Sequence, residues 1–357
     1  MKRLLVCLLL LGVVALCCCA PLSATEDPVA STAVQAETKW VPKWRLPRKW
    51  VDKTATYSVV AQLVSIKNDT VDLAKADGLV VTVKISILSE DDQGFVRVIR
   101  ELKESVARYT KQIGERRDQS TAYFNRGEAN SRLGEVDIAI ADFTQAIRDK
   151  NLMCAGYYHR GLVFQDKGEA KRALVDFKAV TELEVEIASD YFYRGAAYDK
   201  IGNTDKAFAD YNKSIQLDPT DGASYNNRGL VYWKQDKYEK AMADYNKSIE
   251  LDPTAALTYN NRGLIYYTQE NYEKAMVDFS KSIELDPTDG VVYSNRGDAY
   301  YVQEEYEKAI TDYSKAIELD PTAALAYNNR GDAYQELGEK VKADADFARA
   351  KELGFEP

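Results

Sequence analysis

The chain has 357 residues, about twice the length of a typical domain, so more than one folded unit is expected. Apolar residues make up 45% and charged residues 29%, which excludes a largely disordered chain and a polytopic membrane protein. The formal charge of −9 disfavours a nucleic-acid partner. The single histidine, His159, argues against Ser-His-Asp or Cys-His catalysis and against a histidine-rich metal site. We therefore expect no enzyme activity and no cofactor.

The N-terminus has the pattern of an export signal. Lys2 and Arg3 precede an apolar run, 4–16, and small residues follow at Ala20 and Ala24. The run is too short to span a bilayer comfortably, which disfavours a permanent transmembrane anchor. We predict a signal peptide over 1–24 that is cleaved after Ala24, and export to the periplasm or cell envelope.

The three consecutive cysteines at 17–19 leave a second interpretation open, a lipoprotein acylated on one of them. The residue before each of these cysteines is not the small residue that the usual lipobox has, so the match is poor. Four of the five cysteines lie within residues 1–24, and Cys154 is the only cysteine after them, so the part of the chain after residue 24 can form no internal disulfide. Mixed polar residues and prolines predict a linker over 25–45.

Residues 46–97 predict a small β domain. Polar and apolar residues alternate with period two along 57–65, and the pattern resumes in 71–74. The Asp77-Gly78 pair favours a two-residue hairpin turn because both turn positions need positive φ. Residues 80–87 then supply the next strand.

Three strings in this region resemble the Sla-one homology domain, an SH3-like module of a clathrin-associated endocytic adaptor. They are RKW at 48–50, LAKADG at 73–78 and LSEDDQGFV at 88–96. Within the last string, Ser89 and Asp92 have the spacing of a capping box that starts a helix. The adaptor's domain binds short Asn-Pro-Phe-x-Asp peptides, so the resemblance implies a peptide-binding module, with a purely structural β module as the alternative. No binding residue is carried over.

The rest of the chain repeats with a period of 34 residues. An Arg-Gly pair, and an aspartate before an aromatic residue, recur seven times in one phase. This pattern resembles the tetratricopeptide repeat, which implies seven helical hairpins over 120–357, stacked into a right-handed superhelix with a concave face. We expect a mainly α fold, an α-solenoid preceded by a small SH3-like β-barrel domain. The repeated arginines are Arg126, Arg160, Arg194, Arg228, Arg262, Arg296 and Arg330.

Residues 222–255 illustrate one repeat. Helix A is expected over 223–234 and helix B over 238–251, with Gly229 and Tyr245 in signature packing positions. Shifting this repeat back by four periods aligns 98–119 with a degenerate helix B. We predict that this segment caps the apolar edge of the first repeat, because terminal repeats need such caps.

Each arginine is expected to pair with the aspartate of its own repeat, which fixes helix A against helix B through charge-assisted bonds. A role in binding carboxylate ligands is the second interpretation. The pairs chosen as structural ion pairs are Arg228 with Asp244, Arg262 with Asp278, and Arg296 with Asp312.

Asparagines recur on helix A although they are poor residues for a helix interior. Their carboxamides could hold an extended peptide backbone, as in the asparagine ladder of some peptide-binding tetratricopeptide proteins. The alternative is that they bond to neighbouring helices. The predicted peptide-groove residues are Asn226, Asn227, Asn260, Asn261, Asn295, Asn328 and Asn329, with Trp233, Tyr267 and Tyr301 as apolar pockets.

A different recognition mode of the same family, the lysine-containing clamp for acidic chaperone tails, is disfavoured. Phe124, Tyr158, Asn226 and Asn260 occupy the places where its lysine is expected. We therefore predict an exported, non-catalytic protein–protein interaction scaffold that binds peptide segments of partner proteins in the concave groove. Membrane contact would come only through a lipid anchor. The alternative is a structural or assembly component of a cell-envelope complex that uses broad solenoid surfaces, and the sequence indicates no oligomeric state.

Overall fold

The computed structural model describes residues 48–51, 58–76, 78–115 and 118–356. The predicted signal peptide and linker lie outside these residues. The chain divides into two compact units, which are described separately. One contains residues 47–98 and 220–357, and the other contains residues 99–219.

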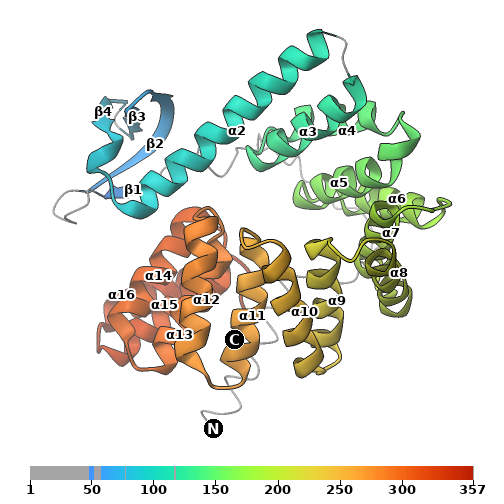
Figure 1. The fold of residues 1–357 in the computed structure, drawn as a ribbon. Helices are drawn as coiled ribbons and strands as arrows, with labels where there is room; N and C mark the ends of the chain where they lie inside the picture. Colours follow the sequence, from blue (N-terminus) through green and yellow to red (C-terminus); the bar gives the residue numbers. More distant parts are fainter. Residues whose placement is uncertain (1–47, 52–57, 77, 116–117, 357) are drawn as a thin grey trace, which may run out of the picture. The chain divides into compact units, whose positions relative to one another are not determined.

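A four-stranded antiparallel sheet forms the β module, a name used here for residues 48–97 (Figure 1). Its strands follow in chain order: β1 (Arg48–Val51), β2 (Ser58–Lys67), β3 (Thr70–Lys75) and β4 (Val80–Lys84). The small β domain expected from the sequence is confirmed as an antiparallel half-barrel.

The strand predicted over 80–87 was too long. Lys84 pairs with Thr70, the first residue of β3, so β4 has no partner residue beyond it. The chain continues as a short 3-10 helix, η2 (Ile85–Ile87), whose first N–H donates to the carbonyl oxygen of Asp69 at 2.8 Å.

The residues that carry the Sla-one resemblance pack inside the β module. Trp50 is almost fully buried, its Nε1 donates to the Ala61 carbonyl at 3.0 Å, and its ring meets Phe95 edge-on with 5.9 Å between centroids. The buried Asp92 carboxylate accepts a bond from the Val51 backbone N–H at 2.8 Å. These contacts tie the start of the following helix to the sheet, so these signature residues have a structural role.

One helix, α2 (Glu90–Gly114), runs through the boundary that the sequence analysis placed at 97/98. Its C-terminal half stands in the register of a helix B. Arg126 Nη1 donates to Thr110 Oγ1 at 3.2 Å, across the same sixteen-residue separation that later arginines use toward preceding helices B. The end of α2 therefore makes the contact expected of a degenerate half-repeat.

In the described part of the chain, fourteen helices follow α2 as seven consecutive A–B pairs (Figure 1), which confirms the mainly α solenoid. The 3-10 helix η3 (Lys150–Leu152) precedes the second pair. The pairs are α3 (Gln119–Arg132) with α4 (Val136–Ala146), α5 (Met153–Asp166) with α6 (Ala170–Thr181), α7 (Ala188–Lys200) with α8 (Thr204–Leu217), α9 (Gly222–Lys234) with α10 (Tyr238–Leu251), α11 (Ala256–Thr268) with α12 (Tyr272–Leu285), α13 (Gly290–Val302) with α14 (Tyr306–Leu319), and α15 (Ala324–Glu336) with α16 (Lys340–Glu352).

Each hairpin closes where the glycine after the repeated arginine meets an aromatic ring of helix B. A Cβ added to Gly263 would lie 2.7 Å from the Phe279 ring, and one added to Gly161 would lie 2.7 Å from Phe177. Across the seven repeats this distance stays between 2.6 and 3.0 Å, closer than a carbon atom can approach a ring without displacement. The repeated glycine is therefore needed for the close approach of the two helices.

The turn from helix A to helix B passes once per repeat through the left-handed region. Glycine occupies this position in repeats 1, 2, 3 and 7, with φ between 68° and 80°. Repeats 4 to 6 have Asp236, Glu270 and Glu304 there, with φ of 55°, 58° and 62°. A side chain at positive φ is strained, so these three turns carry a cost that the others avoid.

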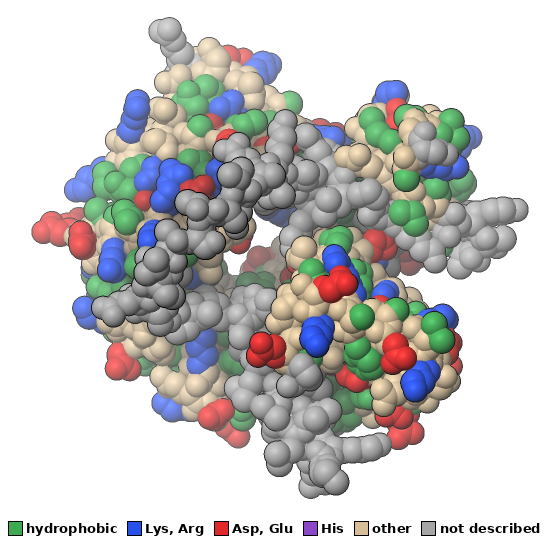
Figure 2. Space-filling model, turned by 180° about the vertical axis from the view of Figure 1, so that it is seen from behind, with side chains coloured by type: hydrophobic (Ala, Val, Ile, Leu, Met, Phe, Trp, Pro, Cys, Tyr) green, Lys and Arg blue, Asp and Glu red, His purple; other side chains and the backbone are tan. Residues whose placement is uncertain are grey.

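Charged side chains of both signs are scattered over the face drawn in Figure 2, and neither sign forms a continuous field there. Charge on that face therefore does not indicate an interaction site. The candidate surface is instead located from equivalent positions in the repeats.

Candidate interaction surface

Within each unit, consecutive helices A touch one another, from α3 to α5 and α7, and from α9 through α11 and α13 to α15. Consecutive helices B approach each other less. Because the elements on the inside of a curved stack lie closer together than those on the outside, the helices A line the concave side. We call their exposed faces the helix A face.

The repeat arginines bind the aspartates of their own repeats through two bonds. Arg262 donates from Nε to Asp278 Oδ2 and from Nη2 to Oδ1, both at 2.8 Å, and Arg160 binds Asp176 with the same distances. The aspartates are buried, and the hydrogen bonds that Arg262 donates to Asp278 raise the pKa of Arg262. The three predicted structural pairs are present: Arg228 with Asp244, Arg262 with Asp278, and Arg296 with Asp312.

The same arginines also reach the preceding repeat, which the sequence analysis did not foresee. Arg262 Nη1 donates to Asn246 at 2.8 Å, and Arg296 Nη1 donates to Ser280 at 3.1 Å. In each case the acceptor lies on the previous helix B, sixteen residues before the arginine. A single guanidinium therefore joins three helices from two repeats, which fixes the stacking as well as the hairpin.

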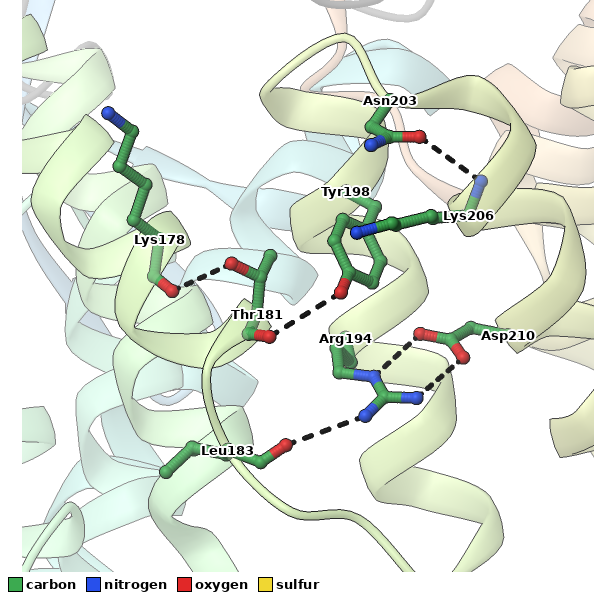
Figure 3. A network of polar contacts seen from close by, with 8 residues as sticks. All are labelled: Lys178, Thr181, Leu183, Arg194, Tyr198, Asn203, Lys206 and Asp210. Atoms are coloured by element: carbon green, nitrogen blue, oxygen red, sulfur yellow. Dashed lines mark hydrogen bonds and ion pairs between the residues drawn. The ribbon is translucent and has the colours of Figure 1, made fainter.

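Arg194 is the exception, and Figure 3 shows why. The residue sixteen positions earlier is Lys178, whose ammonium group cannot accept a bond from an arginine. Arg194 Nη1 instead meets the Leu183 carbonyl at 3.5 Å, and Tyr198 Oη meets the Thr181 carbonyl at 3.4 Å. The joint between repeats 2 and 3 is thus made of longer bonds than the joints next to Ser280 and Asn246.

The carboxamides of the predicted groove bond from one helix A to the next. Asn261 Nδ2 donates to Asn226 Oδ1 at 3.0 Å, and Asn295 Nδ2 donates to Asn260 Oδ1 at 2.8 Å. These four side chains are buried. The contacts match the alternative interpretation, in which the carboxamides join neighbouring helices, and they make the wall of helices A rigid.

Among the other predicted groove residues, Asn329 and Tyr267 are also buried, and the rest lie closer to the surface. Asn227, Asn328, Trp233 and Tyr301 are all half-buried.

Aromatic pairs occur at one equivalent position of repeats 5 and 6. Tyr267 and Tyr301 each lie against the first tyrosine of the following helix B, with 5.4 Å between ring centroids. Burial, together with the charges of Asp332 and Glu336, raises the pKa of Tyr301 to about 12. Tyr301 is therefore a neutral phenol beside acidic groups.

Two carboxylates on helices α13 and α15 were missed by the sequence analysis. Asp298 and Asp332 occupy the position that holds Leu230 in repeat 4 and leucine again in repeat 5. Asp298 Oδ1 accepts bonds from Tyr313 Oη at 2.7 Å and from Asn329 Nδ2 at 3.0 Å. Burial raises the pKa of Asp298 to about 7 despite these bonds. The signal available in the sequence was the change from leucine to aspartate at one position of a strict repeat.

In repeats 1 to 3, ring side chains fill the positions that carry the carboxamide row in later repeats, except that repeat 1 keeps Asn125 directly before its arginine. The His159 ring lies 5.2 Å from Phe124, 5.6 Å from Tyr158 and 5.6 Å from Tyr193 between centroids. Burial lowers the pKa of His159 to about 4, so the imidazole is neutral at pH 7. Phe124 and Tyr158 thus belong to an apolar cluster.

The described residues hold no group of three or more His, Cys, Asp or Glu side chains placed to bind a metal ion. Among the same residues, no helix combines the length and the apolar character needed to cross a membrane.

Comparisons with known proteins bear on both parts of the chain. Models of the tetratricopeptide repeat match residues 120–148, 195–236, 222–255, 256–289, 297–338 and 324–353. A model of the SLA1 homology domain 1 matches residues 38–104. The comparison with curated proteins found no match.

Solved structures similar to this chain include several repeat proteins. A structure of MamA from position 41 to its end, from Desulfovibrio magneticus RS-1, is 20% identical, with 46% of this chain and 94% of that chain covered and a TM-score of 0.42. PilF from Pseudomonas aeruginosa is 22% identical, with 48% and 78% covered and a TM-score of 0.46. The Cut9–Hcn1 assembly of the APC/C is 16% identical, with 68% and 48% covered and a TM-score of 0.51, which supports a shared solenoid fold.

Proposed function

The chain belongs to the tetratricopeptide repeat family and carries an SLA1 homology domain 1 ahead of its repeats, and from this premise we propose that it is an exported scaffold whose helix A face binds segments of partner proteins. Tetratricopeptide repeat proteins bind other proteins, so the family supports an interaction scaffold.

One observation supports the helix A face as the binding face: its helices are joined by buried hydrogen bonds, whereas some of its aromatic side chains are only half-buried. Buried carboxamide bonds, such as Asn261 to Asn226, join the helices A before any partner arrives. Trp233 and Tyr301 remain half-buried at equivalent positions of repeats 4 and 6. A rigid wall with aromatic side chains at regular spacing suits an extended segment, because little order has to be gained on binding.

The test is a double variant, Trp233→Ala with Tyr301→Ala, in affinity-tagged protein produced in its native host. We expect recovery of a specific co-purifying partner to fall at least tenfold. The matched control is Val277→Ala with Val341→Ala, two exposed helix B positions, which should leave recovery unchanged. Circular dichroism melting of both variants checks that they fold. If the control variant lost the partner and the Trp233→Ala with Tyr301→Ala variant retained it, the broad-surface assembly component would be favoured instead.

Export is tested at the N-terminus of the mature protein by mass spectrometry. We expect a chain that starts at Thr25, as cleavage after Ala24 requires. An acylated cysteine from 17–19 as the first residue would replace this with the lipoprotein. An uncleaved chain that starts at Met1 would contradict export.

A further inference from the structure

Three carboxylates on helices α13 and α15 have no basic partner. Among the described residues, no lysine or arginine forms an ion pair with Asp298, Asp332 or Glu336, and no cation lowers the pKa of Asp298 or Asp332. The buried Asp312 and Asp346 in the same repeats are each held by an arginine. Glu336 is exposed, but burial raises the pKa of Asp298 and Asp332. Because a carboxylate out of water is costly without a compensating cation, these two residues need an explanation.

Only one oxygen of the Asp298 carboxylate accepts hydrogen bonds from the described residues. Both bonds to Asp298 end on Oδ1, and Oδ2 accepts none from the described residues. Asn329 is 5% exposed and turns its Nδ2 toward the Asp298 carboxylate, while its own Oδ1 has no hydrogen-bond partner in the described chain. The buried Oδ1 of Asn295 also has none there. The unbonded Oδ1 of Asn329, next to the carboxylate that it contacts, favours a ligand that is a cation rich in donors.

Tyrosine rings complete the pattern. Burial, together with the charge of Asp298, raises the pKa of Tyr267. Asp332 has the same relation to Tyr301 one repeat later. A ring beside a carboxylate suits a lysine or arginine side chain, because the cation is attracted by both the ring face and the negative charge. Two such pairs one repeat apart suit two basic side chains on an extended segment.

From these contacts we propose that the helix A face of repeats 5 to 7 binds a basic segment of a partner protein. One lysine or arginine side chain lies between Tyr267 and Asp298, and a second lies between Tyr301 and Asp332. The inference rests on the proposed function, since it names the chemistry of the segment that the scaffold holds.

The experiment measures binding of fluorescein-labelled octalysine to the full chain by fluorescence anisotropy at 150 mM NaCl. The groove variant is Asp298→Asn with Asp332→Asn and Glu336→Gln. Since the whole chain is acidic, the control removes three charges elsewhere, by Glu239→Gln, Glu273→Gln and Glu307→Gln, all exposed on helices B. We expect the Kd to rise at least tenfold in the groove variant and less than twofold in the control. Equal changes in the two variants, or no change in the groove variant, would overturn the proposal.

Two measurements separate this inference from the scaffold function. Circular dichroism melting checks that the groove variant is folded; if it is not, the single variant Asp332→Asn replaces it, with Glu273→Gln as its control and a rise in Kd of at least threefold expected. Co-purification then compares the groove variant with Trp233→Ala and Tyr301→Ala. Loss of the partner in both supports the basic segment. Loss in the aromatic variant alone overturns the basic segment and leaves the scaffold intact.

Discussion

Repeats 1 to 3 and repeats 4 to 7 build the same hairpin but line it differently. Glycine–aromatic contacts and bidentate arginine–aspartate pairs have nearly the same distances in both regions. The residue before the repeat arginine is asparagine in repeats 4 to 7, whereas in repeats 1 to 3 it is Asn125, His159 and Tyr193 in turn. At the positions of the carboxamide row, the first region therefore has mostly packed rings, and the second has hydrogen-bonded amides. The hairpin contacts determine the fold, and the residues at the carboxamide-row positions can differ between repeats without changing it.

The largest expected change in stability tests the arginine–aspartate pairs, which the two regions share. Arg262→Leu leaves Asp278 buried without its partner and should lower the free energy of unfolding by about 3–5 kcal/mol. Arg160→Leu in the first region should cost a similar amount, because the geometry is the same. Urea denaturation followed by circular dichroism measures both. The matched control, Arg262→Leu with Asp278→Leu, should recover most of the loss, and a loss below 1 kcal/mol for either single change would contradict the shared role.

The second effect is a pH dependence of stability that comes from His159 in the first region. His159 has a pKa of about 4 in the folded chain, lowered by burial from 6.5. The unfolded chain therefore takes up a proton more readily, and stability is lost as the pH falls from about 6.5 to about 4. Linkage puts this loss at about 2–3 kcal/mol.

His159→Phe keeps a ring in the cluster and removes the titration. We expect the difference in unfolding free energy between pH 7.5 and pH 4.5 to shrink by that amount, measured by urea denaturation at both values. Glu128, whose Oε1 lies 3.8 Å from His159 Nε2, stays in both proteins, so the comparison isolates the imidazole. An unchanged pH dependence would show that the imidazole is already solvated.

A smaller effect tests the amide row. Asn261→Ala removes the donor to Asn226 Oδ1 and should cost about 1–3 kcal/mol, because a buried acceptor is left unsatisfied. Asn125 stands at the equivalent position of repeat 1 but is half-buried. Asn125→Ala should therefore change thermal stability by no more than about 0.5 kcal/mol. Equal effects at the two positions would remove the distinction between the two regions.

The smallest effect concerns the turns. Glu304 has φ of 62°, whereas Gly202 has φ of 80° at the equivalent turn of repeat 3. Glu304→Gly should raise the free energy of unfolding by about 1 kcal/mol, because glycine adopts the left-handed region without strain. Gly202→Ala should lower it by a similar amount. Thermal melting measures both, and a destabilising Glu304→Gly would show that the turn side chain makes a compensating contact.

Much of the fold followed from the period of the sequence. Fixed spacing placed the helices of the type repeat at their observed bounds to within a residue, and it paired Arg262 with Asp278. It could not give the end of β4, because that depends on where the partner strand begins at Thr70. The spacing also did not show that the helix starting at Glu90 and the capping helix are one helix, α2, because the 34-residue pattern does not extend back to residue 90.

The candidate surface was less predictable. The sequence located the carboxamide row but not the direction of its bonds, because the choice between a peptide and the next helix depends on distances between repeats. Asn261 and Asn295 are buried by those distances. Asp298 was missed because one acidic residue in a repeat is ordinary at a surface, and only its burial beside Asn329 makes it unusual.

Site-specific photo-crosslinking tests the central claim most directly. A photoreactive phenylalanine analogue placed at Tyr301 in living cells should crosslink the scaffold to a partner protein. The same analogue at Val277, an exposed position on helix B, should give none of that product. Crosslinks from Val277 to the partner, with none from Tyr301, would contradict binding on the helix A face.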